Sequence, residues 1–287
     1  MQGNELLQPL SEKGKSLGKG GIYKHYKGLL YKLISVGRHS ESLEEVAVYQ
    51  ALYGDRDIWV RPLEMFLEHV DLDGKKVSRF KHVDKDKEPL GHIALYLAGN
   101  IQKGHEKESQ VFWTNEDREV IQKGLAPNNV SFLNPALRTD DLSDQKSVFG
   151  RDMTQVFCAN VVFVDARERR GLGVGAEMMW AKMNHLPVLT LAPQNSHYHK
   201  EEVTLLGVTV KNWMHPFVES LSDAVVEDLQ QGVEWLKGFL LGKYQIKGPE
   251  FIHEAMKYYQ TAQFPSDHPM REIFEENPRL QERILQS

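Results

Sequence analysis

Between residues 93 and 191, short apolar runs alternate with helical patterns, and few folds accommodate such an alternation. Runs of strand-forming residues lie at 93–97, 130–133, 161–164 and 188–191. The helical patterns between them extend to about residue 122, begin again near residue 151, and cover 176–184. Strands that alternate with helices build a parallel sheet with helices on both faces. We therefore predict an α/β domain of the flavodoxin- or Rossmann-like kind, with ligands bound beyond the carboxyl ends of its strands.

Residues 1–85 follow a different pattern, in which short strands dominate. Runs of β-branched and aromatic residues lie at 21–27 and 29–36, on either side of Gly28, and further runs lie at 46–53, 58–60 and 77–80. Asp73 and Gly74 form a dipeptide typical of a tight hairpin. This pattern predicts a small β-rich domain, similar in architecture to an SH3-like barrel.

Domain boundaries follow from changes in composition. The segment 81–91 is charged, lacks periodicity and contains a proline and a glycine, as interdomain linkers often do. We place the β-rich domain at 1–85, the α/β domain at 86–245 and a helical C-terminal extension at 246–287. Helices are expected at 221–241, 251–259 and 270–285, the last two wrapping the core.

Composition excludes several classes of protein. The chain has 287 residues, is 41% hydrophobic and has a formal charge of -5, which disfavours nucleic acid as its partner. No apolar run approaches the roughly 18 residues of a membrane span, and the first residues lack the apolar region of a secretory signal. Its one cysteine, Cys158, is expected in the core, and the absence of an internal disulfide fits the cytoplasm.

Three segments at the expected strand ends carry groups that could perform chemistry. Tyr96 precedes a small turn with Gly99, Asp152 follows a glycine and an arginine in the expected first turn of a helix, and Glu177 follows the glycine-rich loop 171–175. Two carboxylates near neighbouring strand ends suit glycosyl transfer. One of them attacks the anomeric carbon while the other exchanges a proton with the leaving group.

Each of these features also has a structural interpretation. Asp152 is compatible with a charge that stabilises the beginning of a helix, and Glu177 with an exposed first-turn glutamate. The glycine loop lacks the G-x-G-x-x-G spacing of a dinucleotide site and has no acidic residue at the ribose position. His197 and His199 have no cysteine or acidic partner at ligand spacing, so no metal is expected.

Residues 92–195 resemble the nucleoside 2-deoxyribosyltransferase family, which includes deoxynucleoside-monophosphate N-glycosidases. The resemblance lies in Tyr96-Leu-Ala-Gly, Gly150-Arg-Asp-Met, Asn160-Val-Val-Phe-Val and the loop that leads to Glu177. It implies that Glu177 is the nucleophile on C1′, that Asp152 is the acid/base facing the nucleobase, and that Tyr96 orients the glutamate or the sugar. It implies no cofactor and a homo-oligomer, because members usually complete their site across a subunit contact. The expected substrate-binding residues are Gly99, Asn100, Gln102, Asn134, Gly171, Gly173 and Gly175.

The chain departs from the family pattern at two positions. Gly171 stands where the transferases often have an aspartate and the nucleotide hydrolases a serine, and Gln102, followed by Lys103, stands where the hydrolases have an arginine. Arginines at 167, 169 and 170 are alternative phosphate ligands, or solvated charges on a loop. These departures leave the identity of the substrate open, and with it the choice between hydrolysis and transfer.

Residues 18–82 resemble a small bacterial domain of unknown function. The resemblance lies in Tyr23-x-His-Tyr-Lys-Gly, Arg38-His-Ser-Glu, Val48-Tyr-x-x-Leu-Tyr and Trp59-Val-Arg-Pro. We interpret the aromatics Tyr26, Tyr49, Tyr53 and Trp59 as core and rim of the small barrel. The four polar residues that begin at Arg38 are expected to form a binding loop, for a modified base or a partner protein.

The functional prediction is cleavage or exchange of the N-glycosidic bond of a (deoxy)nucleoside or nucleotide. Two alternatives remain open. One is degradation of NAD by the same glutamate chemistry, and the other is a module that senses nucleotides without turnover. An intact set of Tyr96, Asp152 and Glu177 disfavours the sensor, because a pure binder has no need of a nucleophile.

Overall fold

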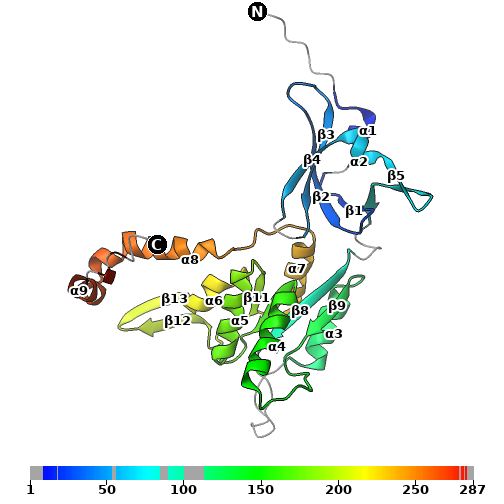
Figure 1. The fold of residues 1–287 in the computed structure, drawn as a ribbon. Helices are drawn as coiled ribbons and strands as arrows, with labels where there is room; N and C mark the ends of the chain where they lie inside the picture. Colours follow the sequence, from blue (N-terminus) through cyan, green and yellow to red (C-terminus); the bar gives the residue numbers. More distant parts are fainter. Residues whose placement is uncertain are drawn as a thin grey trace, which may run out of the picture. The chain divides into compact units, whose positions relative to one another are not determined.

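A computed structural model gives the fold of the chain (Figure 1). The structure describes residues 9–17, 19–53, 56–84, 90–99, 113–277, 279–280 and 282. The chain divides into two compact units. The first unit consists of Met1–Ile93, Glu116–Ser131 and Gln230–Gln245, and the second of Ala94–Asn115, Phe132–Leu229 and Ile246–Ser287.

A five-stranded antiparallel sheet forms most of the first unit, in the order β4-β3-β2-β1-β7. Its strands are β1 Ile22–His25, β2 Leu30–Arg38, β3 Glu45–Ala51, β4 Ile58–Pro62 and β7 Phe80–Val83. Two short helices, α1 Glu12–Ser16 and α2 Leu63–Leu67, and the hairpin of β5 His69–Leu72 with β6 Lys75–Ser78 complete this part. The predicted N-terminal β-rich domain is confirmed.

The expected hairpin turn lies at Asp73 and Gly74. Both residues have positive φ, 51° and 77°, as a two-residue turn between twisted strands requires. The amide of Gly74 also donates to Oδ1 of Asp71, at 2.9 Å. Before this hairpin, residues 65–66 lie in α2, where Phe66 is fully buried in the core of the unit.

The segment 38–41, interpreted as a binding loop, forms part of the connection between β2 and β3. Arg38 donates to the carbonyls of Leu43 and Pro9, at 3.1 and 3.0 Å, and pairs with Glu45. The amide of Ser42 donates to Nδ1 of His39, at 3.2 Å. The polar side chains of Arg38 and His39 therefore stabilise the connection between β2 and β3.

A second, parallel sheet has five strands in the order β14-β11-β10-β8-β9. They are β8 His92–Ala98, β9 Asn129–Leu133, β10 Val161–Asp165, β11 Val188–Leu191 and β14 Ala224–Val226. The helices along this part of the chain are α3 Asn115–Gly124, α4 Gln145–Cys158, α5 Leu172–Met183, α6 Pro216–Leu221 and α7 Leu229–Leu240. Parallel strands with helices confirm the predicted α/β class. Counted along the chain the order is 2-1-3-4-5, so strand order reverses between β8 and β10.

Several sequence predictions about the later elements are wrong. The helix expected at 221–241 is interrupted by β14, because Val225 and Val226 pair with β11. A hairpin of β12 His199–Leu205 and β13 Val208–Met214 was not foreseen, since its strands alternate weakly between polar and apolar residues. The C-terminal helices α8 Glu250–Ala262 and α9 His268–Glu276 exist, and a short 3-10 turn, Phe264–Ser266, joins them. Neither helix contains a buried residue, but Phe251 at the beginning of α8 packs against the core of the second unit.

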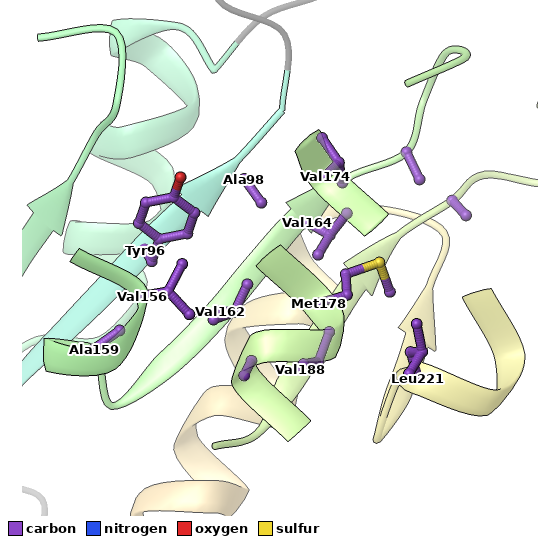
Figure 2. Packing of buried hydrophobic residues seen from close by; sticks show 13 residues of the cluster. Tyr96, Ala98, Val156, Ala159, Val162, Val164, Val174, Met178, Val188 and Leu221 are labelled. Atoms are coloured by element: carbon purple, nitrogen blue, oxygen red, sulfur yellow. The ribbon is translucent and has the colours of Figure 1, made fainter. Parts of the chain in front are cut away.

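The core of the second unit packs α4 and α5 against the parallel sheet (Figure 2). Val156 of α4, Val162 of β10 and Met178 of α5 are buried in it. The two residues after Val156 are not, because they lie on the outer face of α4: Phe157 is 60% exposed and Cys158 is exposed too. The expectation that Cys158 lies in the core is therefore wrong.

A buried ion pair joins α5 to the segment between α6 and β14. Lys182 is fully buried and donates from Nζ to Oδ2 of Asp223 and to the carbonyl of Lys247. Asp223 also accepts from the amides of Val188 and Lys247, at 2.7 and 2.8 Å. Burial lowers the pKa of Lys182, an effect that the charge of Asp223 opposes. The pair thus ties a helix, a strand and the C-terminal segment together.

We expect Asp223→Asn to lower the free energy of unfolding by about 3–5 kcal/mol, because it leaves the ammonium of Lys182 buried without a counter-charge. Urea unfolding followed by circular dichroism measures this change. Adding Lys182→Met to Asp223→Asn removes the stranded charge, so the double variant should regain much of the loss. A double variant less stable than Asp223→Asn alone would contradict this role for the pair.

Candidate functional site

The centre of the candidate site is a hydrogen bond between Tyr96 and Glu177. Tyr96 lies in β8, is fully buried and pairs with Val162 of β10, so it stands beside the point where strand order reverses. Its hydroxyl donates to Oε1 of Glu177 at 2.8 Å. Figure 2 shows the ring of Tyr96 beside Val156 and Val162, with its hydroxyl oxygen pointing away from both. The other carboxylate oxygen, Oε2, is buried and has no hydrogen-bond partner among the described residues.

The environment of Glu177 disfavours its charge. Its side chain lies on α5, in the second helical turn rather than the first as expected, and only 9% of the residue is exposed. Burial raises the pKa of Glu177 to about 7; the hydrogen bond from Tyr96 lowers it, and the nearby charge of Asp152 raises it. Around neutral pH this carboxyl group is therefore present in both protonation states.

Asp152 lies in the middle of α4, not at its beginning. The helix begins at Gln145, where the side chain of Asp144 accepts from the amide of Ser147, so the predicted effect of the helix dipole on Asp152 is wrong. Gly150 suggested a helix start, but the helix continues through it. Burial raises the pKa of Asp152, and the charges of Arg138 and Arg151 oppose this rise.

Two arginines that the sequence analysis did not single out hold Asp152 in place. Arg138 Nη1 and Arg151 Nη1 lie 3.4 and 3.5 Å from Oδ1 of Asp152. Arg138 also forms a tighter pair with Asp140, at 2.6 Å between Nη2 and Oδ2. No local pattern marks Arg138, because its partner Asp152 lies 14 residues further along the chain.

Beside Arg138 and Arg151 the surface is hollowed. An open cavity of about 650 Å³ is lined by Ala136, Leu137, Arg138, Thr139, Asp140 and Arg151. Two guanidinium groups and one carboxylate therefore face a space large enough for a small ligand.

Asp165 is another charged residue that the sequence did not single out. It ends β10, is fully buried and forms ion pairs with Arg167 and Arg170, at 2.9 Å in each case. The amide of Arg170 also donates to the hydroxyl of Tyr198, at 2.7 Å. Arg167 and Arg170 are thus neither solvated loop charges nor free phosphate ligands, whereas Arg169 is exposed. A charged residue directly after the apolar run 161–164 was the signal available in the sequence.

The remaining predicted residues fall into four groups. Gly99 lies at a close approach, where an added Cβ would stand 3.4 Å from Asp165 and from the ring of Trp113. Gly171, Gly173 and Gly175 have open space around their Cα atoms, the first as the residue before α5 and the others within it. Oδ1 of Asn134 accepts from the amide of Ala136 at 2.9 Å and so stabilises the turn after β9. Two more predicted residues, Asn100 and Gln102, lie outside the described residues.

Two other kinds of feature are absent from the described part of the chain. It contains no group of three or more histidine, cysteine, aspartate or glutamate side chains placed to hold a metal ion. Its helices also include none with the length and apolar character needed to cross a membrane.

Comparison with known proteins finds a family match within the first unit. The family model described as "Protein of unknown function (DUF1653)" matches residues 21–82. A crystal structure of a DUF1653 protein from Bordetella bronchiseptica is 32% identical, with a TM-score of 0.23, and the match covers 24% of this chain and 91% of that one. A search of curated proteins found no match. The predicted domain of unknown function within residues 18–82 is confirmed, while the resemblance of residues 92–195 stays a prediction. Through residues 21–82, the chain belongs to the DUF1653 family.

Proposed function

We propose that the second unit cleaves or exchanges the N-glycosidic bond of a (deoxy)nucleoside or nucleotide. The observation that carries this proposal is the buried Glu177, which is oriented by Tyr96 through Oε1 and has Oε2 without a partner among the described residues. An oriented carboxylate with one free oxygen beside a second carboxyl group is the arrangement that a glycosyl-enzyme mechanism needs.

The proposed reaction has two steps. In the first, Oε2 of Glu177 attacks C1′ while the C1′–N bond breaks, and Asp152 gives its proton to the departing base. In the second, water or a second base attacks C1′, Asp152 takes up the proton of that nucleophile, and the bond to Glu177 breaks. Hydrolysis and transfer differ only in the nucleophile of the second step.

The arrangement of the strands supports the same location. The order 2-1-3-4-5 is that of flavodoxin-like sheets, whose ligands bind where strand order reverses, at the carboxyl ends of the strands. In this chain the reversal lies between β8, which carries Tyr96, and β10, which ends in Asp165. The open space around Gly171, Gly173 and Gly175 gives a ligand access to the beginning of α5, the helix of Glu177. We therefore infer a flavodoxin-like fold with its substrate at this switch point.

The raised pKa of Glu177 is a further argument for function. Burial of a glutamate that has only a structural role lowers the stability of the fold and brings no benefit. A catalytic carboxyl group with a pKa of about 7, in contrast, can change its protonation state at the pH where an enzyme works. A module that only binds nucleotides gives no reason to retain such a group.

The decisive experiment is release of free base, followed by chromatography, from a panel of nucleosides, 5′-monophosphates and NAD. We expect Glu177→Gln to lower the rate about a thousandfold or more, because it removes the nucleophile. Asp152→Asn should lower it by about 10²–10⁴. The matched control is Glu254→Gln on α8, an exposed glutamate outside the site, which should leave the rate unchanged.

The panel separates the alternatives. Release from NAD alone identifies an NAD-degrading enzyme with the same nucleophile. If the wild-type protein releases no base from any compound, even with an acceptor base present, the enzymatic proposal fails and a nucleotide sensor takes its place.

The pH dependence of base release tests the state of Glu177. The nucleophile must be ionised and the proton donor Asp152 must be protonated, so kcat/KM should rise with pH as Glu177 ionises and fall again as Asp152 loses its proton. Tyr96→Phe removes the hydrogen bond that lowers the pKa of Glu177, so this rise should move to higher pH. Tyr259→Phe on α8, where the hydroxyl donates to Asp267, should leave the profile in place. A profile that Tyr96→Phe leaves in place would show that ionisation of Glu177 does not control the rate.

Burial of Glu177 also predicts a link between pH and stability. A raised pKa in the folded state gives stability that is fully present below the unfolded pKa and is lost as pH rises through the folded one. The shift from 4.5 to about 7 corresponds to about 3 kcal/mol. Glu177→Gln should therefore unfold at higher urea concentration than wild type at pH 8–9 (about 3 kcal/mol) and show no such gain near pH 4. Equal stability of the two proteins at alkaline pH would contradict the buried charge.

A further inference from the structure

One face of the antiparallel sheet in the first unit carries aromatic side chains on neighbouring strands. The rings of Tyr31 on β2 and Tyr49 on β3 contact each other, with 5.4 Å between their centres. Tyr49 lies directly opposite Trp59 of β4, and directly opposite residues project from the same face of a sheet. This face is therefore built largely from flat rings.

Part of this aromatic face is covered and part is open. Phe66 of α2 stacks on Phe80 of β7, with ring centres 4.3 Å apart, and closes that side. Towards β4 the rings reach solvent: Tyr53 is 38% exposed and Trp59 is 51% exposed. The hydroxyls of Tyr31 and Tyr53 are hydrogen-bonded to each other, which holds both rings in place.

Arg61 stands on the open side of this face. It lies two residues after Trp59 on β4 and so projects from the same side of the strand. Its Nε donates to the hydroxyl of Tyr49 at 3.1 Å, and Tyr49 is only 3% exposed. The buried phenol thus fixes Nε of the guanidinium group, and the described residues form no ion pair with its two terminal nitrogens.

Arg61 differs from Arg38 and Arg79 of the same sheet region, each of which has a carboxylate partner. Arg38 pairs with Glu45, and Arg79 pairs with Glu68. Within the part of the chain that the structure describes, Arg61 makes no ion pair. A guanidinium group with a fixed base and a free fork matches the paired oxygens of a phosphate or carboxylate.

The surroundings of Arg61 are positive as well. Burial lowers the pKa of His25, and the charges of Arg79, Arg61 and Lys27 lower it further. The ammonium of Lys27 lies 5.8 Å from the centre of the Tyr26 ring. An anion that approaches this face therefore meets several cationic groups.

We propose that this face, formed by Tyr31, Tyr53, Trp59 and Arg61, binds small aromatic oxyanions, in which a phosphate or carboxylate group is joined to a flat ring. The fork of Arg61 binds the oxyanion, and the exposed rings of Trp59 and Tyr53 pack against the ring of the ligand. This site lies within the DUF1653 segment and is independent of the function proposed for the second unit.

Calorimetric titration of the full-length protein with four simple compounds tests the proposal. The probes are phenyl phosphate, benzoate, inorganic phosphate and phenol, none of which contains a glycosidic bond. Either of the first two should bind about tenfold more tightly than inorganic phosphate, because the ring adds a packing contact. Phenol should bind more weakly than both. The comparison of phenyl phosphate with benzoate identifies the preferred oxyanion.

Three variants locate the binding. Arg61→Gln should weaken binding of the tighter probe about tenfold or more, and Arg61→Lys nearly as much, because lysine keeps the charge and loses the fork. Trp59→Ala should remove the advantage over inorganic phosphate. The matched control is Lys24→Gln, which removes an exposed positive charge from β1 next to Tyr23 and should leave binding unchanged.

Two results would overturn the proposal. One is the absence of binding of both aromatic oxyanions to the wild-type protein. The other is an equal loss in Arg61→Gln and Lys24→Gln, which would show that net charge alone attracts the anion. Thermal unfolding of each variant checks the fold, and Arg61→Lys, which preserves the charge, keeps the test valid if Arg61→Gln is unstable.

Discussion

Burial of the parallel sheet decides where polar chemistry can lie in the second unit. All five residues of β10 are buried, so a charged side chain on this strand must have a partner of opposite charge or lose its charge. Asp165, which ends the strand, is held by two arginines, and Lys182, fully buried on α5, is held by Asp223. These pairs let charged groups exist inside a structure whose stability comes from apolar packing.

Glu177 does not follow this rule. It lies on the same helix as Lys182 and is nearly as buried, yet its partner is the phenol of Tyr96 and not a cation. Asp152, the nearby charge, has the same sign and raises the pKa of Glu177 further. On α5 the charge of Lys182 is therefore paired, whereas the charge of Glu177 is not and lowers the stability of the fold. Titratable groups in such unfavourable surroundings are often catalytic.

The sequence predicts the helices and strands better than it predicts which side chains contact each other in the fold. Alternating strands and helices identify the parallel sheet, and Asp73-Gly74 marks a hairpin correctly, because both signals are local. The three strand-end segments also lead to a real contact, since Tyr96 and Glu177 meet across 81 residues of chain. The predictions that fail depend on context. β14 is too short to stand out from the helical pattern around it, and Cys158 lies two residues after the buried Val156 on α4.

Pairing, more than residue type, separates the side chains proposed to be functional from the structural ones in both units. The sequence alone does not distinguish one arginine from another. In the fold, an ion pair with a carboxylate is formed by each of Arg38, Arg79, Arg138 and Arg170. Arg61 has a tyrosine hydroxyl instead, as Glu177 does. A phenol can orient a charged group without neutralising it, so the group stays available to a ligand or a reacting atom. The partners that reveal this lie 12 residues away for Arg61 and 81 for Glu177, which is why only the fold identifies them.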